Sequence, residues 1–581
     1  MASGSTSCAT SGSTSCATDA AAALLCGLID QGVRHVVLSP GSRSQALALV
    51  AADLEQRGVI RLHVRIDERV AGFTALGIGR ETGMPAAVVC TSGTAVANLL
   101  PAVLEADHAG VPLLLLTADR PPELRGIGAN QTTRQPGMFA HHVRLEADLP
   151  TPDALDPVGD APQTRMLSAL AAEAVAAARG AGEQSAGPVH LNLPYREPLS
   201  GTLPAWVDSV VAAGEPRAAA AASPVAVPAG EPRVIEHGPR TIVVAGADAG
   251  HAAEQLAHEG GWPLVAEIVS GARFGRHLVH GYRALLAAPD LGGRVERAIV
   301  FGHPTLSREV GELLSRDDVE VLAVRGPGEA LDLNGATVAV DGISLAPGES
   351  DREWLGRWMR ASRAASVDLT PPAPDAEGLA STEPASRLGA IAAELEVIRT
   401  PVDREALVDA VWRATWPHDR LVFGSSRLVR VADAVLGGKR VPVHANRGLA
   451  GIDGTVATAT GIALASQDTG ATGVTRVLLG DLALLHDVGA LLLPPEEDEP
   501  RIQVIVGNDG GGTIFDRLEV AAVASPGAMN RVLYTPHTTR LEHLALAYGW
   551  EYQRITTRSA LDQALTAPAG GRQLIEVPLA R

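Results

Sequence analysis

The sequence predicts an α/β protein built from three doubly wound parallel-sheet domains. Short apolar runs rich in Val, Leu and Ile alternate with segments of helical apolar spacing along most of the 581 residues. Many of these runs end in glycine and a polar residue, which is typical of buried parallel strands. Two intervals rich in Ala, Pro and Gly separate three such series, and a chain of this length is too long for one hydrophobic core.

The domain boundaries follow from where composition changes. The first 18 residues contain SGSTSCAT twice, and a segment so rich in Ser, Thr and Gly cannot bury a core, so we expect disorder over 1–18. The expected α/β domains span 19–200, 241–368 and 386–581, and the expected linkers span 201–240 and 369–385. Pro and Ala enrichment is typical of such linkers.

In the first domain a helix over 20–31 precedes a series of strands, each followed by a helix or a polar loop. The strand-bearing stretches are VRHVVLSPGSRS, IRLHVRIDERVA, AAVVCTSGTA, VPLLLLTADRPP and a closing GPVHLNLPYREPL. The middle domain repeats the pattern in TIVVAGADAG, PLVAEI, RAIVFGHPTLSREVGELL, VEVLAVRGPG and ATVAVDGIS. It lacks GxGxxG, so the sequence does not favour a dinucleotide site there.

Composition excludes several classes of function. The net charge of −18 argues against a nucleic-acid partner or an anionic membrane, and no apolar run is long enough to insert into a bilayer. Lys439 is the only lysine, which leaves little room for Schiff-base chemistry. The four cysteines show neither CxxC spacing nor a disulfide framework, so we expect a reducing, cytoplasmic location.

The third domain contains the stretch on which the functional interpretation depends, residues 476–515. One apolar run ends in Gly480-Asp481, and a second ends in Gly507-Asn508 followed by Asp-Gly-Gly-Gly. A helical segment lies between them, so Asp481 and Asn508 should sit at the carboxyl ends of neighbouring parallel strands, where α/β sheets bind ligands. Their oxygens would suit Mg²⁺ carrying a diphosphate. Both sequences are also common in plain turns, so the interpretation needs support elsewhere.

That support comes from the first domain. The pair Asp481 and Asn508, 27 positions apart, resembles the diphosphate-anchoring motif of thiamine-diphosphate enzymes, which is Gly-Asp, a helix, and then Asn near a glycine. Glu68 follows a strand and opens a helix, as the cofactor-activating glutamate does in these enzymes. An acid at that position could instead only stabilise the helix dipole, but its place in a domain before the Asp481 and Asn508 pair favours the catalytic interpretation.

The finer resemblance is to the 2-succinyl-5-enolpyruvyl-6-hydroxy-3-cyclohexene-1-carboxylate synthase family of menaquinone biosynthesis. The motifs that carry it are SPGSRS, TSGTAVANLLPAVLEA, TADRPPELRGIGANQT, FGSSRLVR, NRGLAGIDGT and GNDGGGTIF, together with the helix start at Asp67-Glu68. The resemblance covers residues 19–581 and is weakest in the middle domain. It implies the three-domain fold of thiamine-diphosphate enzymes. The implied reaction decarboxylates 2-oxoglutarate and adds the succinyl fragment to isochorismate.

The resemblance also implies roles for single residues. Glu68 would activate the cofactor at N1′ of the aminopyrimidine. Asp481, Asn508 and the Gly510 carbonyl would hold Mg²⁺, or Mn²⁺ in its place, and Ile452 would be the bulky residue beneath the cofactor. Further cofactor contacts are implied for Thr91, Ser92, Gly93, Gly480 and Leu482.

The implied substrate pocket is rich in arginine. Both substrates are dicarboxylates, which planar, permanently charged guanidinium groups recognise better than lysine does. The positions implied to contact substrate are Ser42, Arg43, Arg120, Asn130, Gln131, Arg308, Ser426, Arg430, Arg447, Ile514, Phe515 and Leu518. Two departures concern this region: Gly507 replaces a frequent asparagine, and Thr513 is an added residue that puts the placement of Ile514 and Phe515 in doubt.

Two alternatives stay open from the sequence. An acetolactate-synthase-like decarboxylase or carboligase acting on pyruvate would keep Glu68 and the metal ligands but would not need the arginine set. A non-catalytic paralogue would be expected to lose Glu68, which is present. In the family the site lies between the first domain of one chain and the third domain of another, so the resemblance implies a homodimer or a homotetramer.

Overall fold

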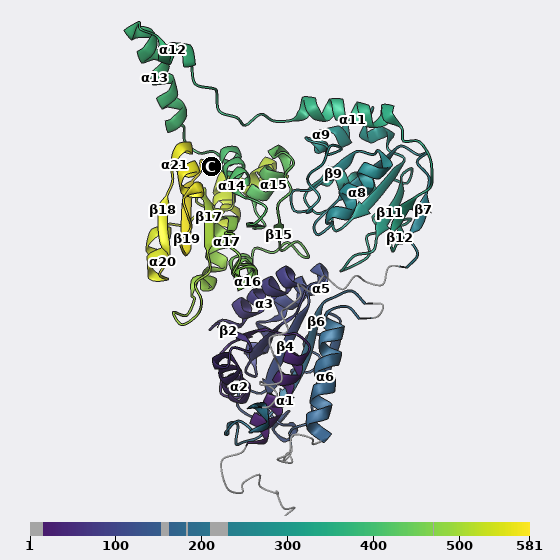
Figure 1. Cartoon of the computed structure of the whole chain (residues 1–581), viewed down its shortest axis with the longest axis vertical. Coiled ribbons are helices and arrows are strands. Elements are labelled where there is room, and N and C mark those ends of the chain that lie inside the picture. The colour runs from purple at the N-terminus through teal and green to yellow at the C-terminus, as the bar shows by residue number, and fades with distance from the viewer. Residues whose placement is uncertain (1–14, 153–161, 182–183, 209–229, 469) are drawn as a thin grey trace, which may run out of the picture.

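The computed structural model describes residues 15–152, 162–181, 184–208, 230–468 and 470–581. It confirms the α/β class: three parallel sheets are each flanked by helices, as Figure 1 shows. The first sheet has the order β2-β1-β3-β4-β6-β5 and all of its strands are parallel. Its strands are β1 (His35–Leu38), β2 (Arg61–Val64), β3 (Ala86–Cys90), β4 (Leu113–Asp119), β5 (Leu145–Asp148) and β6 (Pro188–Pro194). Its helices are α1 (Cys16–Asp30), α2 (Gln45–Gln56), α3 (Glu68–Thr82), α4 (Thr94–Ala97), α5 (Leu100–Ala109) and α6 (Pro162–Ala178).

The middle sheet has five strands in the order β12-β11-β10-β8-β9. These are β8 (Thr241–Ala245), β9 (Leu264–Ala266), β10 (Arg297–Phe301), β11 (Glu320–Val324) and β12 (Val338–Val340). A separate two-stranded sheet pairs β7 (Arg233–Ile235) with β13 (Ile343–Leu345). The helices are α8 (His251–Gly260), α9 (Tyr282–Ala287), α10 (Arg308–Leu314) and α11 (Arg352–Ala365).

The third sheet has the order β15-β14-β16-β17-β19-β18, again parallel. Its strands are β14 (Arg420–Phe423), β15 (Val443–Ala445), β16 (Thr475–Gly480), β17 (Ile502–Asn508), β18 (Glu551–Arg554) and β19 (Arg572–Pro578). Its helices are α14 (Arg404–Ala414), α15 (Arg427–Val435), α16 (Thr455–Asp468), α17 (Asp481–His486), α18 (Val520–Val523), α19 (Pro526–Ala528), α20 (Leu541–Ala547) and α21 (Arg558–Thr566). The first sheet and this one therefore share a six-stranded plan.

Several local expectations need correction. Helix α1 begins at Cys16, so the last three residues of the stretch expected to be disordered are helical, while residues 1–14 lie outside the described part. Cys16 is disulfide-bonded, which contradicts the expectation that the cysteines form no disulfide, whereas Cys26 and Cys90 are free and buried. Strand β7 lies inside the expected linker 201–240, because pairing with the distant β13 stabilises it.

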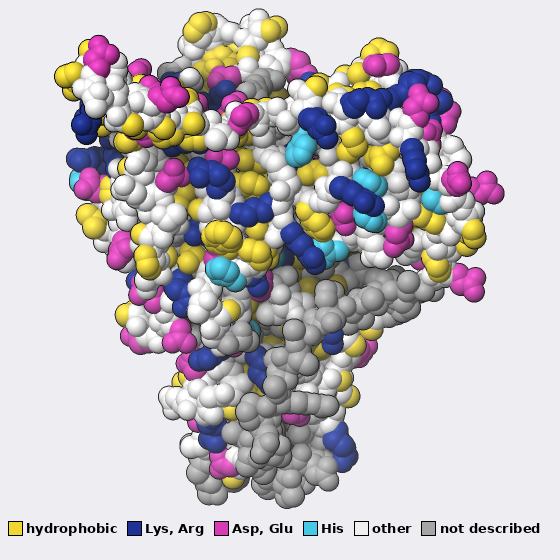
Figure 2. All heavy atoms as spheres, turned by 45° about the horizontal axis from the view of Figure 1, so that its top comes forward, with side chains coloured by type: hydrophobic (Ala, Val, Ile, Leu, Met, Phe, Trp, Pro, Cys, Tyr) yellow, Lys and Arg dark blue, Asp and Glu magenta, His cyan; other side chains and the backbone are white. Residues whose placement is uncertain are grey.

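The second expected linker also contains structure. Helix α12 (Ala376–Ala380) lies within 369–385, and α13 (Pro384–Arg399) starts before its end. The two helices pack together and extend away from the three sheets (Figure 1). Within the described residues, no helix is both long and apolar enough to cross a membrane. Acidic and basic side chains are interspersed over the face seen in Figure 2.

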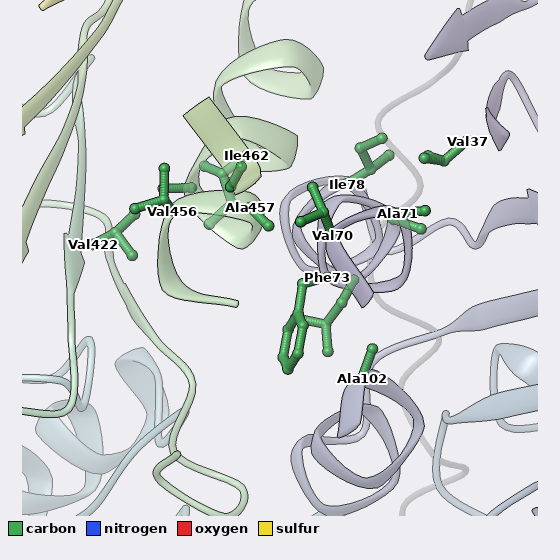
Figure 3. Close-up of a cluster of buried hydrophobic side chains, with 14 of the residues drawn as sticks. Val37, Val70, Ala71, Phe73, Ile78, Ala102, Val422, Val456, Ala457 and Ile462 are labelled. Atoms are coloured by element: carbon green, nitrogen blue, oxygen red, sulfur yellow. The ribbon is translucent and has the colours of Figure 1, made fainter. Parts of the chain in front are cut away.

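The first and third domains share one hydrophobic core, formed where α3 packs against α16. Figure 3 shows Val70, Phe73 and Ile78 of α3 beside Val456 and Ile462 of α16. Glycine permits the close approach on each helix. A Cβ on Gly77 of α3 would lie 2.0 Å from the carbonyl oxygen of Thr458, and a Cβ on Gly461 of α16 would lie 2.0 Å from that of Thr74. Neither separation is possible for real atoms, so both positions require glycine.

Candidate functional site

The carboxyl ends of β16 and β17 bring the predicted metal ligands to one edge of the third sheet. The strands pair in parallel with Gly480 opposite Gly507, so the residues that follow, Asp481 and Asn508, are neighbours. Asp481 is the first residue of α17 and is buried. Its Oδ2 accepts a hydrogen bond from the Gly511 N–H at 2.8 Å, which ties the glycine-rich loop to β16. Burial raises the pKa of this carboxyl, and His537 opposes the shift.

The other two predicted ligands lie in that loop. Oδ1 of Asn508 accepts from the Gly510 N–H at 3.1 Å, and its Nδ2 donates to Glu576 at 2.8 Å, so the amide oxygen faces the loop. The Gly510 carbonyl accepts from the Arg581 guanidinium at 2.7 Å. A carboxylate, an amide oxygen and a backbone carbonyl form a hard oxygen set of the kind that Mg²⁺ prefers. The donor chemistry therefore fits a divalent cation.

The loop approaches its surroundings too closely for side chains. A Cβ on Gly511 would lie 2.3 Å from the Tyr534 carbonyl, and its φ of 147° also favours glycine. A Cβ on Gly512 would lie 2.8 Å from the Leu533 carbonyl. The two glycines thus let the loop backbone pass close to the 533–534 segment while leaving its polar groups near Asp481.

A pocket of about 290 Å³ opens beside these residues, and its lining comes entirely from residues 404–579 of the third domain. Nine predicted site residues line it: Ser426, Arg430, Arg447, Ile452, Gly480, Asp481, Leu482, Ile514 and Phe515. Both residues whose placement the added Thr513 put in doubt are therefore at the pocket. Asn508, Gly510 and Leu518 are not among the lining residues, and Leu518 is exposed.

Of the four arginines that line the pocket, Arg430 and Arg447 are held at the border with the middle domain. Arg447 is 4 % exposed, and burial lowers its pKa. Burial also lowers the pKa of Arg430, and the charge of Arg283 adds to that effect. Ser426 caps α15 by accepting from the Leu428 N–H, which places Arg430 one turn into the helix. Guanidinium groups that are partly removed from water favour binding of an anion.

A second group of predicted residues forms in the first domain, at the carboxyl ends of β1, β3 and β4. Ser92 links two of them: its Oγ accepts from Arg120 and donates to the Gln131 carbonyl at 3.0 Å. Gln131 returns a hydrogen bond to the Ser92 carbonyl. Arg43 donates to the Tyr195 carbonyl at 3.0 Å, and its charge, after burial, helps lower the pKa of Arg120.

The remaining first-domain positions surround this group. Thr91 lies so close to Gly41 that a Cβ on that glycine would overlap the threonine side chain. Gly93 has a positive φ of 85° and its N–H donates to Gln135. Ser42 and Asn130 are exposed in their loops.

Glu68 opens α3, as the sequence predicted. The preceding Asp67 caps the helix by accepting from the N–H groups of Arg69 and Val70. Glu68 is half-buried and lies close enough to Cys90 for its charge, after burial, to raise the pKa of that thiol. Within the described part of the chain, Glu68 does not line the pocket that contains Asp481.

Arg308 is also outside the pocket. It is the first residue of α10, two-thirds exposed, and pairs with Glu519 at 3.2 Å. Of the five arginines implied to contact substrate, Arg430 and Arg447 line the pocket, whereas Arg43, Arg120 and Arg308 are not among its lining residues.

The structure adds residues beside the predicted metal ligands that sequence reasoning missed. His537 Nε2 lies 3.0 Å from Asp481 Oδ2, and Arg581 contacts the Gly510 carbonyl. Arg404 pairs with Asp509 at 2.6 Å and also lines the pocket. Only Asp509 had a sequence signal, its place in the Asn-Asp-Gly run; the others are distant in sequence and carry no motif.

Most of the first domain matches a known class of protein. The family profile described as "Thiamine pyrophosphate enzyme, N-terminal TPP binding domain" matches residues 18–140. With three parallel sheets and the Asp481 pocket, this defines an α/β enzyme of the thiamine-pyrophosphate-binding class. The full-length relatives narrow the class further.

Curated relatives named 2-succinyl-5-enolpyruvyl-6-hydroxy-3-cyclohexene-1-carboxylate synthase match almost the whole chain. The proteins of Leifsonia xyli subsp. xyli and Clavibacter michiganensis subsp. michiganensis are each 54% identical, over 97% of this chain and 96% of their own. That of Kineococcus radiotolerans is 45% identical over 95% of this chain and 94% of its own. The chain belongs to the 2-succinyl-5-enolpyruvyl-6-hydroxy-3-cyclohexene-1-carboxylate synthase family.

Proposed function

We propose that the chain is a thiamine-diphosphate-dependent transferase that decarboxylates 2-oxoglutarate and adds the succinyl fragment to isochorismate in menaquinone biosynthesis. The observation that carries the proposal is the pocket itself: the Asp481 carboxylate lies in one cavity with the half-buried Arg430 and the buried Arg447, and Asn508 and the Gly510 carbonyl belong to the loop next to Asp481. The full-length family relationship supports the same reaction. The product is 2-succinyl-5-enolpyruvyl-6-hydroxy-3-cyclohexene-1-carboxylate, released with CO₂.

The cofactor would be held chiefly through a metal. When bound, thiamine diphosphate supplies the electron sink for decarboxylation and carbon–carbon bond formation. Asp481, Asn508 and the Gly510 carbonyl would hold Mg²⁺, or Mn²⁺ in its place, and through it the diphosphate. Since the Gly510 carbonyl accepts from Arg581, that guanidinium would have to move to free the carbonyl. Glu68 would accept and return a proton at N1′ of the aminopyrimidine.

The arginines would bind the carboxylates of both substrates. A guanidinium group in a water-poor pocket forms charge-assisted hydrogen bonds that are stronger than those at a surface. Ile452, Ile514 and Phe515 supply the apolar part of the pocket wall and would exclude water. A pyruvate-specific carboligase of the acetolactate-synthase type needs no such arginines, because its donor lacks the distal carboxylate.

We propose that the active unit is a homodimer, or a homotetramer made of two such dimers. Glu68 and the pocket of Asp481 lie in different domains, and the pocket draws its lining from 404–579 alone. A second chain would supply the Glu68 carboxylate and the arginines of its first domain. Each dimer would then contain two composite sites.

One experiment tests reaction and assembly together. Release of CO₂ from 2-oxoglutarate, with and without isochorismate, is measured in the presence of thiamine diphosphate and Mg²⁺, with pyruvate as the competing donor. Glu68→Gln and Asp481→Ala are each expected to be inactive. Mixed after reversible dissociation, they should recover about a quarter of the wild-type activity, because half of random dimers contain one intact site.

The possible outcomes separate the proposals. Preference for pyruvate would replace the donor assignment by the acetolactate-type reaction. An active wild type without recovery in the mixture would place Glu68 and Asp481 of one site on the same chain and refute the composite dimer. As the control, each variant is taken alone through the same dissociation and reassociation.

A further inference from the structure

Glu267 is a fully buried carboxyl in the middle domain that the proposed reaction does not use. It follows β9 directly and is outside the lining of the Asp481 pocket. Its Oε1 accepts from the N–H groups of Thr305 at 2.9 Å and Leu306 at 2.7 Å, and its Oε2 accepts from Thr305 at 3.1 Å. When the oxygens of a buried carboxyl accept hydrogen bonds from backbone N–H groups, they fix the conformation of the segment that carries those groups.

The segment so fixed holds a pocket arginine. Oγ1 of Thr305 accepts from Nε of Arg447 at 2.9 Å and from Nη2 at 2.7 Å, and its carbonyl accepts from Nη2 at 3.1 Å. Thr305 therefore binds one edge of the guanidinium group from the middle domain. The remaining nitrogen, Nη1, donates one long hydrogen bond of 3.4 Å to the Ser425 hydroxyl, and both residues line the pocket. That part of the group is the one left to meet a ligand.

The charges around Glu267 are consistent with this arrangement. Burial, followed by the nearby Asp433 carboxylate, raises the pKa of Glu267 to about 8, while the two N–H donors and Arg447 oppose the shift. Asp433 itself is fully engaged: it accepts from Tyr282 at 2.6 Å, Arg283 at 2.7 Å and the Ile268 N–H at 2.9 Å, and it pairs with Arg273. It docks α15 on the middle domain and leaves Glu267 to hold the Thr305 segment.

We propose that Glu267 and Thr305 are positioning residues for substrate binding: Glu267 fixes the backbone at Thr305, and Thr305 orients the Arg447 guanidinium group toward a substrate carboxylate. The proposal deepens the proposed function and rests on it. It gives the middle domain a role in substrate affinity, although its own sheet contributes no residue to the pocket lining. Thr305 acts through Arg447 and Glu267 acts through Thr305, so neither touches substrate.

Matched variants test each link. Thr305→Val removes the acceptor but keeps the shape, whereas Thr305→Ser keeps the hydroxyl. We expect Thr305→Val to raise KM for one of the two substrates by roughly tenfold with a smaller change in kcat, and Thr305→Ser to restore the wild-type value. Glu267→Gln keeps an oxygen that can accept both N–H groups, so it should resemble the wild type, while Glu267→Leu should repeat the effect of Thr305→Val.

Three further measurements separate positioning from loss of structure. Thiamine-diphosphate affinity by calorimetry should stay unchanged, since the metal ligands lie elsewhere, and thermal midpoints show whether Thr305→Val is folded. A crystal structure of Thr305→Val should show the Arg447 guanidinium group turned from its wild-type direction, a readout that needs no activity. An unmoved Arg447, or equal KM values in the valine and serine variants, would overturn the proposal. An inactive wild type whose Arg447 does move in Thr305→Val would overturn the proposed function alone.

Discussion

The imidazole of His537 lies 3.0 Å from the carboxylate of Asp481, although 56 positions separate them in the sequence. The same carboxylate oxygen also accepts from the Gly511 N–H. This oxygen, Oδ2, is thus held by two donors, one from the glycine loop and one from the segment before α20. A cation that binds Asp481 must replace or share these contacts, which makes the residue a direct test of the metal assignment.

Replacing Asp481 with Ala is expected to abolish Mg²⁺-dependent binding of thiamine diphosphate while the fold persists, because a carboxylate ligand is removed from an otherwise intact strand end. Titration calorimetry with and without Mg²⁺ measures the effect, and circular dichroism checks the fold. Asp498→Ala, at an exposed position, is the matched control. Wild-type cofactor affinity in the Asp481 variant would contradict the assignment.

Replacing Glu68 with Gln should reduce turnover severely and leave cofactor affinity nearly unchanged. The amide keeps the shape of the side chain but cannot take up the proton at N1′. Exchange of the cofactor C2 proton, followed by NMR, should slow in parallel. Glu173→Gln, on the exposed face of α6, controls for the loss of one charge. Undiminished C2 exchange in the Glu68 variant would show that another group activates the cofactor.

Truncating Arg430 or Arg447 to Ala should lower kcat/KM by roughly ten- to more than a hundredfold, since a charge-assisted hydrogen bond in a desolvated pocket is worth about 1.5–3 kcal/mol. Cofactor affinity should change little. Arg363→Ala, on the exposed end of α11, should have no effect because surface charges contribute about 0–1 kcal/mol. Steady-state kinetics with both substrates compares the three variants. An unchanged kcat/KM in Arg447→Ala would contradict a role for Arg447 in substrate binding.

The crossing of α3 and α16 should not tolerate a methyl group. Gly461→Ala would place its Cβ 2.0 Å from the Thr74 carbonyl, and forced repacking of this kind costs about 1–3 kcal/mol. The thermal midpoint should fall. Gly311→Ala in α10 is the control, because no atom lies within 4 Å of the added carbon and the change should stabilise by about 0.4–1 kcal/mol. Equal thermal midpoints for both variants would mean that the crossing of α3 and α16 accommodates the added methyl group.

The buried carboxyl of Asp487 should make the stability of the fold depend on pH. Burial raises its pKa to about 7 from 3.8, against the pull of the Val456 and Ala457 N–H groups and Arg69. Between those values the folded protein retains a proton that the unfolded chain has lost, so this group makes stability fall as pH rises from about 4 to 7. Asp487→Asn can still accept both N–H groups but cannot titrate.

Midpoints of urea unfolding at pH 5 and pH 7 test the pH dependence expected from Asp487. The difference between the two midpoints should be smaller in Asp487→Asn than in the wild type, while Asp498→Asn, at an exposed position, should keep the wild-type difference. The same midpoint difference in all three proteins would mean that Asp487 is ionised in both folded and unfolded chains across this range.

Much of the architecture could be predicted because its causes are local. An apolar run ended by glycine predicts a buried strand wherever it occurs, and the strands ending at Asp481 and Asn508 were located in this way. The helix start at Glu68 has its cap in the neighbouring Asp67. Strand β5 was missed because Leu145–Asp148 is short and only half-buried, so it lacks the apolar signal.

The sequence alone determined the α/β class, the repeated alternation of strand and helix, and the positions of Asp481, Asn508 and Glu68 at the ends of elements. Tertiary structure decided which distant groups meet: His537 with Asp481, Thr305 with Arg447, and the glycines of α3 and α16 with each other's backbone. Strand and helix signals depend on neighbours within a few residues. Contacts between distant segments depend instead on how whole helices and sheets pack, which no local pattern encodes.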